Sequence, residues 1–250
     1  MQPEEKPASS FTANPIITVK DIESIHRFIK VYQHQLLLAN PDQKLTVVQN
    51  TDSITTATQV IALPSWRGQV PPDTKIIRFA INPKRQPMSF VIIPGTSAPP
   101  DHKLTSAAID RTHQGAKYAV FKKADALVLS GFGSPTHPTE AQQMASLLPN
   151  YPLTLLLDNL ANSTAANAVC THQLIAALDP SATVTVFASW SNALRLHLLF
   201  NQVFRPTHVQ THVLFGFTHS ASWYPGIIGL FHMKTHTRNA HVLLENYHNA

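Results

Sequence analysis

Charged side chains and cysteines are both scarce in this sequence of 250 residues. Lys and Arg number 19 and Asp and Glu 14, so that 13% of the residues are charged, against about 25% in an ordinary soluble domain. The single cysteine, Cys170, cannot form a disulfide within the chain, which favours a reducing compartment. These figures exclude a disordered acidic or basic tail, a collagen-like repeat and a disulfide-rich scaffold.

Long apolar runs and dense basic clusters are also lacking. No apolar run approaches the roughly 18 residues that a membrane-spanning helix needs. The first residues, MQPEEKPASS, contain no apolar core of a signal peptide. The net charge of +5 results from the scarcity of acids, and the densest basic stretches are only Lys122–Lys123 and Lys84–Arg85. We therefore expect a cytoplasmic protein with no membrane span and no nucleic-acid partner.

Apolar residues are plentiful, at 44% of the chain, and their spacing divides it into two parts. Residues 1–17 are rich in Pro and Ser and are expected to be flexible. Residues 18–88 are expected to form an N-terminal extension, in which apolar residues from Val19 to Leu38 recur at the three- and four-residue steps of a helix. Short strands separated by Asn, Ser and Pro clusters are expected after this helix. They are Leu45–Val48, Gln59–Leu63 and Lys75–Ile81.

Residues 89–250 alternate regularly between apolar runs and helical patterns. Strands that are apolar throughout and alternate with helices are typical of a parallel sheet covered on both faces. The sequence therefore predicts a Rossmann-like, doubly wound α/β domain with a mainly parallel sheet. Its strands are expected at Phe90–Ile93, Ala126–Leu129, Leu153–Leu157, Val184–Phe187 and His212–Phe215. Its helices are expected at Leu104–Lys123, Glu140–Leu148, Ser163–Leu178, Ser191–Phe204 and Ile228–Tyr247.

Small and hydroxylated residues dominate the segments that directly follow these strands. Ligands of open parallel sheets bind at the carboxyl ends of the strands, where backbone N–H groups and helix N-termini approach a phosphate or carboxylate. Tight turns and helix caps account for the same residue types without any ligand. The segments are Gly95-Thr96-Ser97, Ser130-Gly131-Phe132-Gly133, Asp158-Asn159, Ser189-Trp190-Ser191-Asn192 and Phe217-Thr218-His219.

Five short motifs follow one another between residues 90 and 204. They are Ile92-Ile93-Pro94-Gly95-Thr96; Arg111 in the next helix; Ser130-Gly131-Phe132-Gly133 with Glu140 downstream; Asp158, Ala161, Thr164, Ala166 and Asn167; and Ala188-Ser189 with Asn192 and Arg195. In this order and spacing they resemble the DUF218 family, the YdcF/SanA/ElyC-like proteins. The resemblance covers about half of the chain and implies a small-molecule site at the strand ends.

The sequence departs from the family pattern at four of these positions. Asn192 stands where the family has His, Ala166 where it has Glu, Ala161 where it has Ser, and Phe132 where it has the second Gly of the Ser-Gly-Gly turn. An imidazole transfers protons near pH 7 and a carboxamide does not. Asn192 can still orient a ligand, because its amide both donates and accepts hydrogen bonds.

Glu140, Arg111 and Arg195 are the principal candidates for chemistry in this site. Glu140 could act as a base, as an acceptor for a ligand hydroxyl or as a metal ligand, or could simply be a first-turn Glu favoured by the helix dipole. The two arginines are candidate anion clamps, since a guanidinium binds phosphate or carboxylate through two hydrogen bonds; ordinary helix-surface arginines are the alternative. Thr164 and Asn167 either bind the ligand or cap their helix.

The 14 histidines do not form a recognisable metal motif. His232 and His236 are four residues apart, but no Cys pair and no HExxH pattern accompanies them. His219 could replace the missing family His, and His137 is a second candidate. Walker A, GxGxxG and Gly-x-Ser-x-Gly patterns are missing as well, so no redox cofactor is indicated and no metal is predicted.

Two hypotheses follow. In the first, the chain is a DUF218/YdcF-like hydrolase or group-transfer enzyme that acts on an anionic, nucleotide-like small molecule; in the second, it is a non-catalytic metabolite-binding or accessory protein with a degenerate site. The predicted catalytic residues are Glu140 and His219. The predicted ligand-binding residues are Gly95, Thr96, Arg111, Ser130, Gly131, Gly133, Asp158, Thr164, Asn167, Ser189, Asn192 and Arg195.

Overall fold

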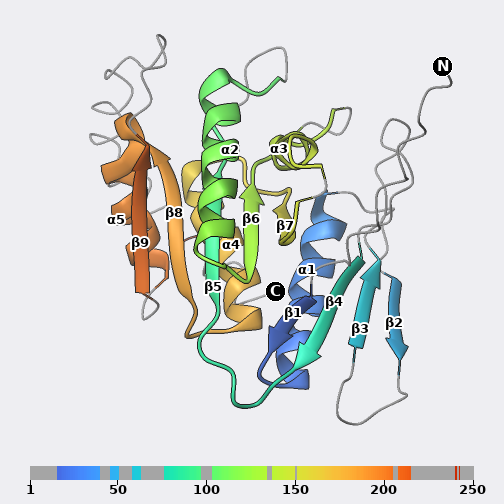
Figure 1. Cartoon of the computed structure of the whole chain (residues 1–250). Coiled ribbons are helices and arrows are strands. Elements are labelled where there is room, and N and C mark those ends of the chain that lie inside the picture. The colour runs from blue at the N-terminus through green and yellow to red at the C-terminus, as the bar shows by residue number, and fades with distance from the viewer. Residues whose placement is uncertain are drawn as a thin grey trace, which may run out of the picture.

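Two β-sheets, one of five strands and one of four, form the framework of the chain (Figure 1). The computed structural model describes residues 16–39, 46–50, 58–62, 76–96, 103–133, 137–149, 151–204 and 208–214, together with residues 240 and 242. Within these ranges no helix is both long and apolar enough to cross a membrane.

The five-stranded sheet is parallel throughout, as the apolar strands predict. Its order is β7-β6-β5-β8-β9, and every neighbouring pair is parallel. The chain builds outward from β5 to β7 on one side and then crosses to β8 and β9 on the other, so that the strand order reverses between β5 and β8. The strands are β5 (Ser89–Pro94), β6 (Ala126–Ser130), β7 (Thr154–Asp158), β8 (Thr183–Ser189) and β9 (His208–Leu214).

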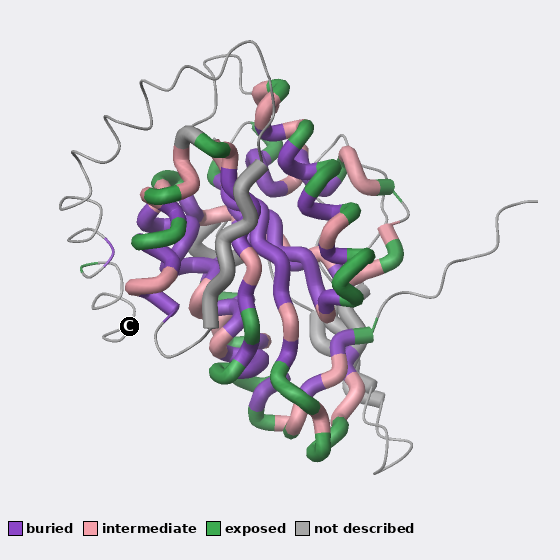
Figure 2. The backbone as a smooth tube through the Cα atoms, turned by 60° about the vertical axis from the view of Figure 1, so that its left-hand side comes forward, coloured by how far each residue is buried: buried purple, intermediate pink, exposed green. Residues whose placement is uncertain are grey.

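Helices cover both faces of this sheet, which confirms the doubly wound α/β class. Val91 and Ile93 of β5 pack in one core with α2 and α3, whereas Phe90 and Ile92 point to the opposite face and pack in the core with α4 and α5. The central strands β5 and β6 are accordingly buried, apart from the half-buried Ser89 at the start of β5 (Figure 2). The helices are α2 (Ser106–Phe121), α3 (Glu140–Ser146), α4 (Thr164–Leu178) and α5 (Ala193–Val203).

The N-terminal extension forms the second, smaller sheet and one helix. The sheet order is β1-β4-β3-β2, with β1 parallel to β4 and the other pairs antiparallel. Phe28 and Tyr32 of α1 lie in the same core as α4, and the Gln35 side-chain amide donates to the Cys170 carbonyl at 3.2 Å, so α1 joins the extension to the larger sheet. The elements are β1 (Ile16–Val19), α1 (Ile22–Ala39), β2 (Thr46–Asn50), β3 (Thr58–Ala62) and β4 (Ile76–Ile81).

Most boundaries differ from the expected ones by one or two residues, and three of the differences stand out. Strand β1 begins at Ile16, inside the segment expected to be flexible, and Ile17 is fully buried. Helix α1 begins at Ile22, because Asp21 accepts a hydrogen bond from the Ser24 N–H and so marks its start. Strand β9 begins four residues before the expected His212 and pairs with β8 over its full length.

The expected helix Ser191–Phe204 is divided in two. A short 3₁₀ turn, η1 (Trp190–Asn192), precedes α5. The last expected helix, Ile228–Tyr247, and the candidate His219 lie outside the described residues, apart from residues 240 and 242.

Candidate functional site

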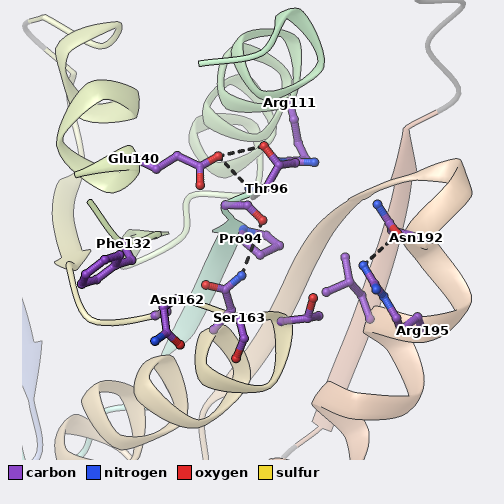
Figure 3. Close-up of a pocket in the computed structure, with 14 residues that line it drawn as sticks. Pro94, Thr96, Arg111, Phe132, Glu140, Asn162, Ser163, Asn192 and Arg195 are labelled. Atoms are coloured by element: carbon purple, nitrogen blue, oxygen red, sulfur yellow. Dashed lines mark hydrogen bonds between the residues drawn. The ribbon is translucent and has the colours of Figure 1, made fainter. Parts of the chain in front are cut away.

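A pocket of about 360 Å³ opens at the carboxyl end of β5, beside the point where the strand order reverses (Figure 3). This is the place where open parallel sheets bind their ligands. The turn after β5, the helices α2 and α3, the loop before α4 and the start of α5 all contribute to its wall. The lining residues are Pro94, Gly95, Thr96, Arg111, Phe132, Glu140, Ala161, Asn162, Ser163, Thr164, Asn167, Asn192, Arg195 and Leu196.

The Glu140 carboxylate is held against the turn that follows β5. One carboxylate oxygen accepts hydrogen bonds from the backbone N–H of Thr96 at 2.6 Å and from its hydroxyl at 2.9 Å. Gly95 leaves room for this carboxylate, because a Cβ at that position would collide with Glu140 Oε2 and would lie 2.8 Å from the Ser130 carbonyl oxygen. The glycine of this turn is therefore needed for close approach.

The start of α3 fixes the position of Glu140. Thr139 caps the helix and forms a reciprocal capping box with Gln142, and the Glu140 N–H donates to the carbonyl of Phe132. Glu140 is only 5% exposed. Burial raises the pKa of Glu140 above its ordinary value, against the opposing effects of the Thr96 hydrogen bonds and of Arg111. A raised pKa makes this carboxylate a stronger base than that of an ordinary glutamate.

Arg111 brings a buried positive charge to the pocket from α2. The side chain is 2% exposed, and its Nη1 donates to the Ser189 hydroxyl at 3.1 Å. Its Nε and Nη2 are buried without a hydrogen-bond partner among the described residues. Burial lowers the pKa of Arg111 to about 10, so the guanidinium stays charged at neutral pH. Buried unsatisfied donors are rare in folded proteins because each one is costly.

Arg195 brings a second guanidinium, which Asn192 orients. Its Nη2 donates to the Asn192 side-chain oxygen at 2.9 Å, and its buried Nε has no partner among the described residues. Burial lowers the pKa of Arg195 below its ordinary value. Asn192 is therefore a hydrogen-bond acceptor for Arg195.

Ser130, Asp158 and Asn167 form a floor beneath the pocket, and all three are buried. The Ser130 hydroxyl lies 2.5 Å from a carboxylate oxygen of Asp158 and 2.9 Å from the side-chain oxygen of Asn167. One hydroxyl hydrogen cannot serve both acceptors, but a protonated Asp158 would donate to Ser130 and leave the Ser130 hydrogen for Asn167. Burial raises the pKa of Asp158 to about 6, in agreement with such a chain.

The N-terminus of α4 lies at the edge of the pocket. Ser163 caps the helix by accepting from the Ala166 N–H. The N–H groups of Thr164 and Ala165 precede this capped amide and have no partner within the helix. The helix start therefore adds a partial positive charge to the side of the pocket that holds Asn167 and Thr164.

The predicted site residues fall into three groups. Eight line the pocket: Gly95, Thr96, Arg111, Glu140, Thr164, Asn167, Asn192 and Arg195. Five support it from behind, namely Ser130, Asp158 and Ser189 through hydrogen bonds, and Gly131 and Gly133 by leaving room for Glu140 and Thr139. His219 lies outside the described residues, and His137 is exposed and does not line the pocket.

Six lining residues were not among the predicted ligand-binding residues. Asn162 and Ser163 could have been found by following the loop after Asp158 to the start of α4. Pro94, Phe132 and Ala161 lie within the motifs of the sequence, whereas Leu196 carries no sequence signal of its own. The six are Pro94, Phe132, Ala161, Asn162, Ser163 and Leu196.

Metal binding finds no support in the described part of the chain, where no three His, Cys, Asp or Glu side chains gather closely enough to hold an ion. A comparison of the chain with models of known protein families, with curated proteins and with solved structures gives no match.

Proposed function

We propose that this protein is a DUF218/YdcF-like cytoplasmic enzyme that binds an anionic small molecule at the carboxyl ends of its parallel strands and hydrolyses it or transfers a group from it. The observation that carries the proposal is Arg111, an almost fully buried side chain that lines the pocket and whose Nε and Nη2 have no hydrogen-bond partner among the described residues.

The cost of burying Arg111 supports an anionic ligand. A buried cation without a partner destabilises a fold by several kcal/mol unless something compensates for it. Glu140 contributes a favourable charge to Arg111, but no direct hydrogen bond or ion pair links the two side chains. A phosphate or carboxylate between Arg111 and Arg195 would pair with the unsatisfied donors of both residues.

Glu140 supplies the group that could act on such a ligand. Its carboxylate is oriented by Thr96, and its raised pKa suits it to accept the proton of a water or ligand hydroxyl as that oxygen attacks. The leaving group would depart with the bonding electrons and take a proton from solvent. The two arginines would stabilise the negative charge that develops on the anionic group.

A screen of thermal stabilisation tests this proposal. Inorganic phosphate, sugar phosphates and nucleotides would be compared, since a ligand at 100 times its Kd adds about 2.7 kcal/mol to the stability of the folded state. We expect at least one phosphate compound to raise the melting temperature of the wild-type protein and to have no such effect on Arg195→Ala. A Lys117→Gln variant, which removes an exposed charge from α2, is the matched control. If no anionic compound stabilises the wild type, the proposal is wrong.

A non-catalytic binding protein is the second candidate, and two observations favour it. Thr96 already donates two hydrogen bonds to one oxygen of Glu140, and Asn192 cannot transfer protons where the resembling family has a histidine. Glu140→Gln separates the two functions. An enzyme would lose turnover and keep its thermal response to the ligand, whereas a binding protein would show no turnover in either form.

A further inference from the structure

The pocket has an aromatic end, formed by a phenylalanine whose backbone is held in place. Phe132 lines the pocket, and 45% of the residue is exposed. Its N–H donates to the Ala161 carbonyl at 3.0 Å, and its carbonyl accepts from the Glu140 N–H at 3.1 Å. Backbone hydrogen bonds thus hold Phe132 both to the loop before α4 and to the start of α3. A large apolar side chain on a firmly held turn is a ready stacking platform.

The opposite end of the pocket is cationic. Figure 3 shows Phe132 and Asn162 on one side, Asn192 and Arg195 on the other, and Glu140, Thr96 and Arg111 between them, with Arg111 on the side of the Glu140 carboxylate that faces Arg195. The volume of about 360 Å³ lies near the lower limit for small-molecule pockets, roughly 300 Å³. These dimensions suit a ligand that has two chemically different ends and is smaller than a dinucleotide.

We propose that the ligand is a flat ring joined to a phosphate through a hydroxylated linker, as in a nucleoside monophosphate, and that Phe132 selects it by stacking on the ring. The phosphate lies between Arg111 and Arg195, and the linker hydroxyls face Glu140. This inference rests on the proposed anion-binding function and adds to it the second half of the ligand.

Three physical features support this orientation. The guanidinium donors without partners lie only at the cationic end, within the described part of the pocket, so the phosphate belongs there. A carboxylate accepts hydrogen bonds from hydroxyls but repels a phosphate, so Glu140 suits the linker. Stacking on an aromatic side chain tolerates any flat ring, because every base presents a π-face.

Binding of four probes tests the inference: adenosine monophosphate, uridine monophosphate, ribose 5-phosphate and phenyl phosphate. Wild type is expected to bind both nucleotides more tightly than ribose 5-phosphate, and Phe132→Ala to weaken nucleotide binding roughly tenfold. Ribose 5-phosphate binding should be unchanged in that variant. Phe132→Trp should restore the preference for nucleotides. Phe121→Ala, which removes a 77% exposed phenylalanine from the end of α2, should change none of these affinities.

Different outcomes distinguish failure of the inference from failure of the proposed function. Equal binding of ribose 5-phosphate and both nucleotides by the wild type would overturn the stacking role and leave the anion site standing. An equal loss of all four ligands in Phe132→Ala would also overturn it, because a ring that stacks does not hold the phosphate. Tighter binding of phenyl phosphate than of either nucleotide would overturn the nucleoside part. If no phosphate compound binds the wild type, the proposed function itself is wrong.

Discussion

The floor of the pocket and its cationic wall, formed by Arg111 and Arg195, differ in how completely their polar atoms are hydrogen-bonded. On the floor, Ser130, Asp158 and Asn167 bond to one another, and Asp158 also accepts from the Leu160 N–H at 3.0 Å. On the wall, Arg111 and Arg195 each hold one guanidinium nitrogen in a side-chain hydrogen bond while other buried nitrogens have no partner among the described residues.

This difference separates residues that build the pocket from residues that are available to a ligand. A group whose hydrogen bonds are complete within the protein contributes to folding, and its loss leaves its partners unsatisfied. A buried donor without a partner lowers stability until a ligand binds it. We therefore expect substitutions on the floor to act on stability and substitutions on the wall to act on binding.

Asp158→Ala on the floor should have the largest effect on stability. The change leaves the Ser130 hydroxyl and the Leu160 N–H without their carboxylate partner in a fully buried site, and we expect a loss of about 3 kcal/mol. Chemical unfolding measures this loss. Asp110→Ala, on the exposed side of α2, should change stability by less than about 0.5 kcal/mol. Similar values for the two variants would contradict the role of the floor.

The pH dependence of stability should carry the signature of the same carboxyl. Because the pKa of Asp158 is raised from 3.8 to about 6, the folded state binds its proton more tightly than the unfolded chain does. This contribution is complete below about pH 4 and is lost as the pH rises through about 6, with a total of roughly 3 kcal/mol. Asp158→Asn should remove this pH dependence, so the difference in unfolding free energy between wild type and variant, measured by urea unfolding at fixed salt, should change by roughly 3 kcal/mol over that range. Tyr32 of α1 should be left unsubstituted in this experiment, because it interacts electrostatically with Asp158. A constant difference between the two proteins across the range would refute the assignment.

Gly95→Ala should disturb the turn after β5, which packs against Ser130 of the floor and against the Glu140 carboxylate. The new Cβ would meet the Glu140 carboxylate and the Ser130 carbonyl oxygen, so the turn after β5 would have to shift. We expect a destabilisation of about 1–3 kcal/mol and a weaker thermal response to phosphate compounds. Ser106→Ala, on the exposed first turn of α2, serves as the control. Wild-type stability together with a wild-type ligand response would show that this turn tolerates a side chain.

Replacing the two arginines Arg111 and Arg85 with methionine should have the smallest effects, and effects of opposite sign. Arg85 forms an ion pair with Asp125, whose carboxylate also accepts from the Ser89 N–H, so Arg85→Met should lower stability by about 1 kcal/mol. Arg111→Met should leave the ligand-free protein equally stable or up to about 1 kcal/mol more stable, because it removes a buried charge that lacks full pairing. Thermal unfolding in a buffer without phosphate compares the two. A clear loss of stability in Arg111→Met would assign this arginine to the framework.

Much of the framework could be predicted from the sequence, because its signals are local. The apolar runs at β5, β6, β7 and β8 mark buried parallel strands, and the rule for strand ends then places Gly95, Ser130, Asp158 and Ser189 at one edge. The start of strand β9 could not be predicted, because polar residues interrupt its sequence, HVQTHVL, and leave no continuous apolar run.

The pairing of the site residues could not be predicted from the sequence. Whether Arg111 pairs with a carboxylate or remains unpaired depends on the meeting of α2 with β8, which no local pattern encodes. The acceptor role of Asn192 likewise appears only when α5 brings Arg195 beside it. In the sequence, Phe132 is only a departure from the Ser-Gly-Gly turn. Its place in the pocket lining depends on the hydrogen bond from its N–H to the Ala161 carbonyl in the loop before α4.

The most direct test of the central claim is a titration of inorganic phosphate monitored by melting temperature, at constant ionic strength with chloride as the balancing ion. We predict that wild type and Lys117→Gln gain stability with rising phosphate and that Arg111→Gln does not, because the buried Arg111 guanidinium pairs with the anion and the exposed Lys117 side chain does not. An equal gain in Arg111→Gln would contradict an anion site built on this arginine.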